Sequence, residues 1–225
     1  LLLFATLFSC MRQEKPLPAE LSRAESVMWE HPDSALSILR SMPQSSLSIG
    51  KNYATWALLL AQARDKVYGK RLPDSLNIPS SDKLVQDAMD YFEKEGDLKR
   101  MAQTYYYKGQ LLKDQKKITE AMPFFLKSKE MMTKLDEPLF TYLICQSLGN
   151  MYRYQDLYEE SLVQLKDAYQ YALRSGNGER ISYALSELGR TYVHKNEMDS
   201  ALFYFGKSLD NAQRLGNIEL EAMAM

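Results

Sequence analysis

Glycine, proline, cysteine and histidine are all scarce in this sequence of 225 residues. It contains ten glycines, eight prolines, two cysteines and two histidines. Two cysteines cannot build a disulfide scaffold, and there is no Cys-x-x-Cys pair or Cys/His cluster to bind zinc. All-β proteins and glycine-rich nucleotide-binding folds usually need more glycine than this. A long and mostly helical chain does not, so the composition favours helices.

Charge and hydropathy exclude two further classes of protein. The 28 Lys and Arg residues are balanced by 29 Asp and Glu residues, and the net charge is −1. Such a balance argues against nucleic-acid binding through phosphate contacts. No run approaches the roughly 18 consecutive apolar residues that a membrane-spanning helix needs. The hydrophobic content of 45% is ordinary for a folded globular chain.

The first ten residues have the pattern of a targeting signal. Residues 1–9 are apolar or small, too few to span a bilayer but typical of the core of a secretory signal. Leu7-Phe8-Ser9-Cys10 resembles the lipobox of bacterial lipoproteins, in which the peptide is cleaved before a cysteine that then carries lipid. The resemblance implies a signal peptide over residues 1–9, and a lipidated Cys10 with its tether over residues 10–17. The alternative is an ordinary signal or anchor in which Cys10 is incidental.

An internal repeat of 40 residues is the strongest pattern in the sequence. Gly109, Gly149 and Gly189 follow one another at this spacing. Three further positions, alternately small and bulky, keep the same period: Ala121, Ser161 and Ala201; Phe125, Leu165 and Phe205; Ser128, Ala168 and Ser208. The turn residues also keep it: Gly96, Asp136, Gly176 and Gly216. A fixed period of this size indicates stacked supersecondary units.

Each unit is predicted to be a pair of helices. Apolar residues recur at helical spacing in the first helix, as in Cys145, Leu148 and Tyr152. The recurring glycine lies inside that helix, where it costs roughly 1 kcal/mol relative to alanine. We therefore expect a close approach of the second helix, with the small residues at 121, 161 and 201 facing the glycines. We also expect Phe205 to be a buried aromatic.

This pattern resembles the tetratricopeptide repeat (TPR). The residues that fit two consecutive units are Leu148, Gly149, Tyr152, Ser161, Leu165 and Ala168, then Leu188, Gly189, Tyr192, Ala201, Phe205 and Ser208. The resemblance implies an all-α, right-handed α-solenoid of stacked antiparallel helix pairs, with units longer than the usual 34 residues. It divides the chain into degenerate pairs over residues 18–96 and three regular units over residues 97–216. Residues 217–225 begin a further unit, so we expect the natural chain to continue past Met225, and we expect its true start upstream of Leu1.

The degenerate part contains a long predicted loop over residues 69–81. It separates a first helix at about 50–67 from a second helix at 82–95, and a shorter pair is predicted over 19–30 and 33–42. A tolerated surface loop is the favoured interpretation, and a lip over the groove is the alternative.

No catalytic constellation is found. His31 and His194 have no nearby Ser or Cys in a nucleophile motif. Gly206-Lys207-Ser208 imitates the end of a phosphate-binding loop, but it falls in the middle of a predicted helix. Cys145 occupies a core position of its unit. We therefore expect no enzyme, no cofactor and no metal.

The TPR resemblance implies a concave groove lined by the first helix of each unit. The positions carried over from the family are Gln103, Tyr106, Gln110, Gln146, Asn150, Arg153, Tyr183, Ser186, Arg190 and His194, with Lys113, Leu143 and Tyr154 at further groove positions. Amides can bond an extended peptide backbone, and tyrosine supplies contact area at low entropic cost. The family's carboxylate clamp is not reproduced, because its lysines are missing.

Two functions fit these observations. The first is a protein- or peptide-binding scaffold, exported and lipid-anchored to a bacterial membrane, with no nucleic-acid partner. The second is the sensory arm of a membrane-bound signalling or transcriptional regulator. Eighteen or more apolar residues after Met225 would favour the regulator, and a capping helix followed by a stop would favour the scaffold.

Overall fold

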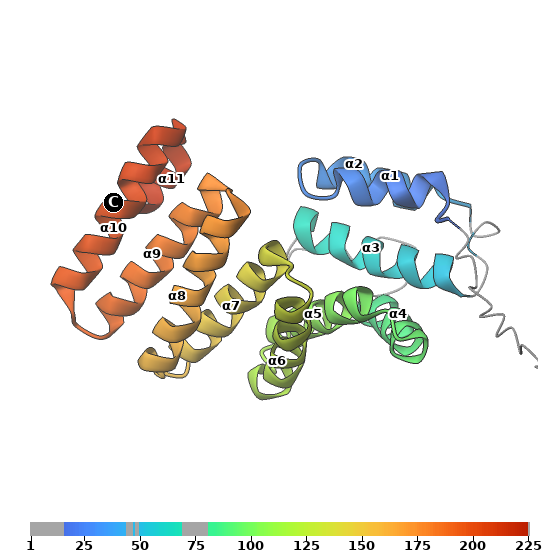
Figure 1. The fold of residues 1–225 in the computed structure, drawn as a ribbon, viewed down its shortest axis with the longest axis horizontal. Helices are drawn as coiled ribbons and strands as arrows, with labels where there is room; N and C mark the ends of the chain where they lie inside the picture. Colours follow the sequence, from blue (N-terminus) through green and yellow to red (C-terminus); the bar gives the residue numbers. More distant parts are fainter. Residues whose placement is uncertain (1–15, 44–46, 48–49, 69–80, 225) are drawn as a thin grey trace, which may run out of the picture.

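The computed structural model describes residues 16–43, 47, 50–68 and 81–224, and every regular element in them is a helix (Figure 1). The helices are α1 (Ala19–Val27), α2 (Pro32–Ser41), α3 (Lys51–Tyr68), α4 (Ser81–Glu95), α5 (Leu98–Asp114), α6 (Ile118–Lys134), α7 (Pro138–Arg153), α8 (Tyr158–Ser175), α9 (Gly178–His194), α10 (Met198–Leu215) and α11 (Ile218–Ala224). The predicted all-α solenoid of stacked helix pairs is confirmed. The predicted signal peptide, Cys10 and nearly all of the 69–81 loop lie outside the described residues.

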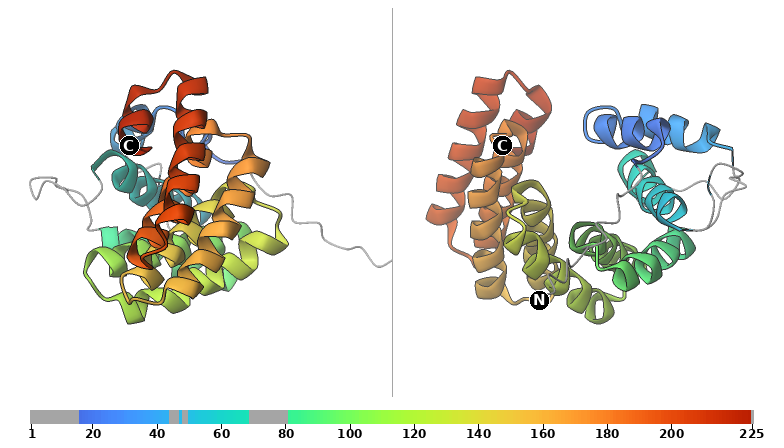
Figure 2. Two further views of the ribbon diagram at one scale, coloured as in Figure 1. Left: turned by 90° about the vertical axis from the view of Figure 1, so that its left-hand side faces the viewer. Right: turned by 45° about the vertical axis from the view of Figure 1, so that its right-hand side comes forward.

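The helices follow one another in a curved row that forms an open C (Figure 2). Each helix packs against the next, and the pairs α5–α6, α7–α8 and α9–α10 are the most extensively packed. In addition α3 packs directly on α5, and α7 on α9. Among the described residues, no comparable packing joins α6, α8 and α10. The helices α3, α5, α7 and α9 therefore line the inner face of the C, and α6, α8 and α10 lie outside. None of the described helices is both long and apolar enough to span a membrane.

Polar side chains and glycines fix the ends of these helices. Asp97 and Asn177 cap α5 and α9, each accepting a hydrogen bond at 3.0 Å from the backbone N–H three residues further on. Gly176 and Gly216 end α8 and α10 with φ angles of 66° and 63°, in the left-handed region that glycine tolerates without strain. Asp136 takes the same conformation with a φ of 54° after α6. The predicted turn residues thus end the second helices.

The recurring glycines make room for a large side chain of the second helix. A Cβ at Gly149 would lie 2.6 Å from the Leu165 Cγ, and one at Gly189 would lie 2.8 Å from the Phe205 Cδ1. The predicted close approach is confirmed, but the small residues are not what faces the glycines. Ser161 is a partial exception, because its backbone carbonyl oxygen would lie 3.3 Å from a Cβ added at Gly149. The large side chain fills this space because it comes one helical turn after the small residue, and so lies opposite the glycine.

The bulky position of each unit is not equally buried in the three pairs. Phe125 and Leu165 are fully buried, whereas Phe205 is only half-buried. The expectation that Phe205 is a buried aromatic is therefore wrong. The reason is that only the short helix α11 packs on α10 from the far side within the described chain.

Candidate functional site on the inner face

Five of the ten side chains that the sequence predicted for a groove reach the surface on the helices of the inner face, and a sixth does so at the end of α9. Gln110, Gln146 and Asn150 are half-buried there, and Tyr183 and Arg190 are exposed. The Asn150 Oδ1 is buried and accepts no hydrogen bond within the described part of the chain. These groups come from α5, α7 and α9 and form an open polar tract.

Three of the predicted groove residues are instead buried beneath that tract, where they contact other side chains of the protein. Tyr106 is buried, with its ring centroid 5.8 Å from that of Phe125 and 6.0 Å from that of Phe140. Its hydroxyl accepts a hydrogen bond from the Gln110 Nε2 at 3.0 Å, and burial raises the pKa of this hydroxyl. Gln103 is also buried. Tyr106 and Gln103 therefore stabilise α5 and offer little surface to a partner.

Arg153 is the third, and it joins α7 to α9 through a buried ion pair. Its Nη2 lies 2.7 Å from the Glu187 Oε2, and both side chains are only 9% exposed. Its Nη1 also donates to the Glu187 backbone carbonyl at 3.3 Å. Arg190 binds the other carboxylate oxygen of Glu187 at 2.6 Å, but its side chain is 43% exposed. Arg190 can therefore contact a partner, whereas Arg153 has a structural role.

The groove assignment of Ser186 is wrong. Its hydroxyl is buried and lies 2.9 Å from the Ser208 Oγ, in the contact between α9 and α10. Ser208 also donates to the backbone carbonyl of Ser182 at 2.9 Å. Ser182 and Ser186 are one helical turn apart, so this side of α9 faces its own hairpin partner. His194 is exposed at the end of α9, where its ring stacks on that of Tyr158 at 6.0 Å between centroids.

Replacing Glu187 by glutamine should destabilise the chain by about 1–3 kcal/mol. The change keeps the shape of the side chain but leaves the buried Arg153 guanidinium without a counter-charge. Urea denaturation of the variant measures the loss. Arg190→Gln is the matched control, because it removes an exposed partner of the same carboxylate and should cost less than about 1 kcal/mol. Equal losses in the two variants would contradict the structural role of Arg153.

A second cluster lies at the edge of the inner face and was not predicted from the sequence. It consists of Trp29 in the turn between α1 and α2, Lys66 on α3 and Arg180 in the first turn of α9. The Lys66 Nζ lies 3.4 Å from the centroid of the indole, and the Arg180 Cζ lies 5.6 Å from it. Phe140 meets the same indole edge to face, at 5.5 Å between centroids. Residues from four elements thus meet at one aromatic ring.

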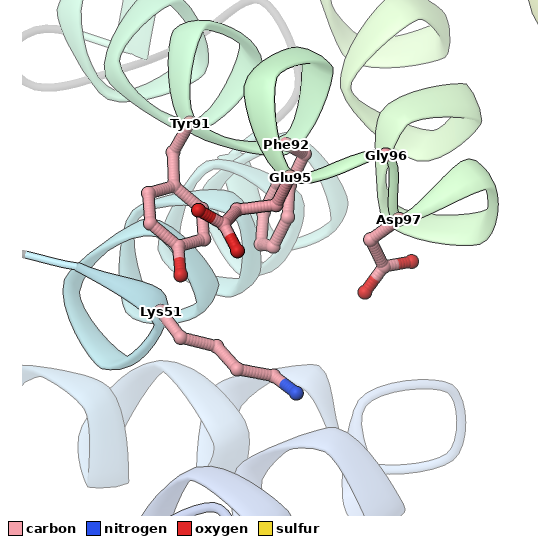
Figure 3. A pocket seen from close by; sticks show the side chains of 6 residues that line it. All are labelled: Lys51, Tyr91, Phe92, Glu95, Gly96 and Asp97. Carbon is pink, nitrogen blue, oxygen red and sulfur yellow. The ribbon is translucent and has the colours of Figure 1, made fainter. Parts of the chain in front are cut away.

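A hollow of about 180 Å³ lies between the start of α3 and the end of α4 (Figure 3). Its lining residues are Lys51, Tyr91, Phe92, Glu95, Gly96 and Asp97. No histidine, cysteine or serine lines it, so it offers no nucleophile for covalent catalysis of the serine or cysteine type. Among the described residues, no three or more His, Cys, Asp or Glu side chains are grouped so as to hold a metal ion.

Comparison with known proteins establishes the fold. No protein-family model and no curated protein matches the sequence. Among solved structures, a signal-transduction ATPase with numerous domains (STAND) that carries a TPR sensor, from Pyrococcus horikoshii, matches with a TM-score of 0.71 and 17% identity over 91% of this chain and 31% of that one. The apo form of RapI matches with a TM-score of 0.71 and 17% identity, over 91% of this chain and 73% of that one. BtubC from P. vanneervenii gives a TM-score of 0.57 and 11% identity, over 92% and 84% of the two chains.

This chain spans about a third of the length of the STAND protein. At these identities the likeness is one of architecture. Together with the helix pairs described above, it shows that the chain has a TPR-like fold of helical repeats.

Proposed function

We propose that this chain is a protein-interaction scaffold that acts by binding and not by catalysis, with an extended peptide or a helix of its partner on the inner face. The observation that carries the proposal is the open polar tract of Gln146, Asn150, Tyr183 and Arg190 on α7 and α9. Amide side chains can pair with a peptide backbone, and the Asn150 Oδ1 accepts no hydrogen bond from the described residues. Tyrosine and arginine are the residue types that contribute most to protein interfaces.

A capture experiment with the purified chain tests this proposal. The double variant Asn150→Ala, Arg190→Gln changes two side chains of the tract and leaves both members of the buried Arg153–Glu187 pair in place, with no new charge beside Glu187. Lys207→Glu on α10 is the control, because it reverses an exposed charge on the outer face. We expect to capture a protein that binds the original chain and the Lys207→Glu control but not the double variant. The same difference should appear when the captured protein is purified and tested again. Equal binding to all three chains would contradict the proposal.

We further propose that the scaffold is exported and held at a bacterial membrane by lipid on Cys10. This rests on the lipobox resemblance of residues 7–10. Each acyl CH₂ buried in the bilayer contributes about 0.8 kcal/mol, and two or more chains anchor a protein stably.

Cys10→Ala should therefore move the protein from the membrane fraction to the soluble fraction of fractionated cells. The cause is the loss of the thiol that carries the lipid. Mass spectrometry of the N-terminal peptide provides the direct readout in the original chain. An unmodified Cys10 in membrane-bound protein would rule out the anchor.

A second candidate function is the sensory arm of a membrane-bound signalling or transcriptional regulator. It is favoured by the match to a STAND protein whose TPR part is described as a sensor. Sequencing the reading frame beyond Met225 separates the two candidates. A run of 18 or more apolar residues followed by a further domain supports the regulator, and a capping helix followed by a stop codon supports the scaffold.

A further inference from the structure

We propose that Lys66 and Arg180, both held against the indole of Trp29, form an anion site at the edge of the inner face that receives a carboxylate of an acidic segment of the partner. This inference rests on the proposed scaffold function, whose ligand class it names. The residues are far apart in the sequence and outside the groove positions of the repeat pattern, so the site is distinct from the polar tract.

The geometry holds two positive charges close to one aromatic ring. Both cations contact the indole, and the two ring distances together limit the separation of the Lys66 Nζ and the Arg180 Cζ to about 9 Å. All three side chains are half-buried, so they remain accessible from solvent. Phe140 packs edge-on against the indole and fixes its orientation.

Neither cation is in a direct ion pair with a carboxylate of the described residues. In the described part of the chain, Lys66 makes no ion pair or hydrogen bond through its ammonium group, and the Arg180 guanidinium makes none either. Asp65 and Glu179 lie close enough to offset some of the charge. Burial and the charge of Arg180 nevertheless lower the pKa of Lys66 to about 8, and burial lowers the pKa of Arg180. The fold therefore keeps two partly desolvated cations in mutual repulsion, a cost that a bound anion would offset.

Two further features bear on the ligand: the first favours an anion, and the second favours an anion with a single charge. Arg180 lies in the first turn of α9 and Phe140 in the first turn of α7, and the N-terminal end of a helix attracts anions. Asp65 and Glu179 stand beside the cations, so a dianionic phosphate would be repelled more than a carboxylate. Arginine also binds carboxylates through two parallel hydrogen bonds. The amides of the neighbouring tract suit the backbone of the same peptide.

Fluorescence anisotropy with a labelled hexaglutamate peptide tests the site, with labelled hexaglutamine as the uncharged comparison. We expect the chain to prefer hexaglutamate. Lys66→Gln and Arg180→Gln should each weaken its binding at least about tenfold. Lys207→Gln is the matched control, because Lys207 also stacks on an aromatic ring, that of Phe203 at 4.3 Å, and should change the affinity less than about twofold. The melting temperature of Lys66→Gln should be unchanged or higher, because the repulsion with Arg180 is removed.

Binding should also depend on pH, because Lys66 loses its charge as the pH rises through about 8. The charged groups that act on Lys66 are Arg180, which favours loss of the proton, and Asp65, which opposes it. We expect hexaglutamate affinity to fall between pH 7 and pH 9. In Lys66→Arg the guanidinium stays protonated, so binding should persist and this fall should disappear.

Several outcomes would overturn the inference. Equal binding of hexaglutamate and hexaglutamine, or unchanged affinity in Lys66→Gln and Arg180→Gln, would show that the cluster is not an anion site. Displacement of hexaglutamate by a lower concentration of inorganic phosphate than of free glutamate would assign the site to phosphate. If hexaglutamate binds as expected but the polar tract variants still capture the partner, the scaffold proposal fails and the anion site stands. If hexaglutamate binding is lost in the polar tract variants but not in Lys66→Gln or Arg180→Gln, the anion-site inference fails and the scaffold proposal stands.

Discussion

Gly149→Leu is expected to destabilise the chain by about 3 kcal/mol, the upper end of the usual cost of overpacking a core. The first added atom alone would lie 2.6 Å from the Leu165 Cγ and 2.7 Å from its Cδ2. Leu165 is fully buried, so its side chain cannot move aside into solvent. The only relief is a separation of α7 from α8, which removes buried apolar contacts along the whole hairpin. Thermal and urea denaturation of the variant measure this loss.

Gly206→Ala provides the control for that experiment. Gly206 is exposed within α10, and an added Cβ would meet nothing within 4 Å. Alanine is favoured over glycine inside a helix, so this change should stabilise the chain by about 0.5–1 kcal/mol. The two glycine substitutions, both inside helices, should therefore change the stability in opposite directions. An unchanged melting temperature in Gly149→Leu would show that the repeat register is wrong.

Phe125→Ala is expected to cost about 3–5 kcal/mol, the usual range for truncating a buried aromatic side chain. Phe125 is fully buried and packs over Gly109, where a Cβ would lie 3.0 Å from its ring. Its ring also contacts that of Tyr106, so truncation would open a cavity between α5 and α6. The free energy of unfolding from urea titrations gives the cost directly.

Phe205→Ala tests whether burial causes that cost. Phe205 occupies the equivalent position in the α9–α10 pair but is only half-buried. It should therefore lose less stability than Phe125→Ala when both are measured in the same chain. A larger loss at Phe205 than at Phe125 would contradict the described packing of the terminal pair.

The fold could be predicted from the sequence because local patterns determine it. The 40-residue period depends on residues within one helix pair or between adjacent pairs. Asp97 and Asn177 end their turns by capping the next helix, and Gly176 and Gly216 adopt the left-handed conformation that ends a helix. Each of these features is visible in a window of a few residues. The helical architecture follows from their repetition.

The candidate site was only partly predictable, for two physical reasons. The family pattern assigns Ser186 to the groove, but its hydrogen bond to Ser208 shows that it faces its hairpin partner. The role of a half-buried helical position depends on a neighbour that the pattern does not specify. The cluster of Trp29, Lys66 and Arg180 forms because the curved row of helices brings the α1–α2 turn to the ends of α3, α7 and α9. A repeat register predicts contacts between adjacent units and carries no information about such long-range closure.

Site-specific photo-crosslinking tests the central claim, that partners bind on the inner face, most directly. A photoreactive amino acid replaces Tyr183 on α9, whose side chain is 41% exposed on the inner face, or Val163 on α8, which is 58% exposed on the outer face. After irradiation in cells that naturally produce the chain, the account predicts one discrete crosslinked partner from position 183 and none from position 163. A partner crosslinked from position 163 and absent from position 183 would contradict it.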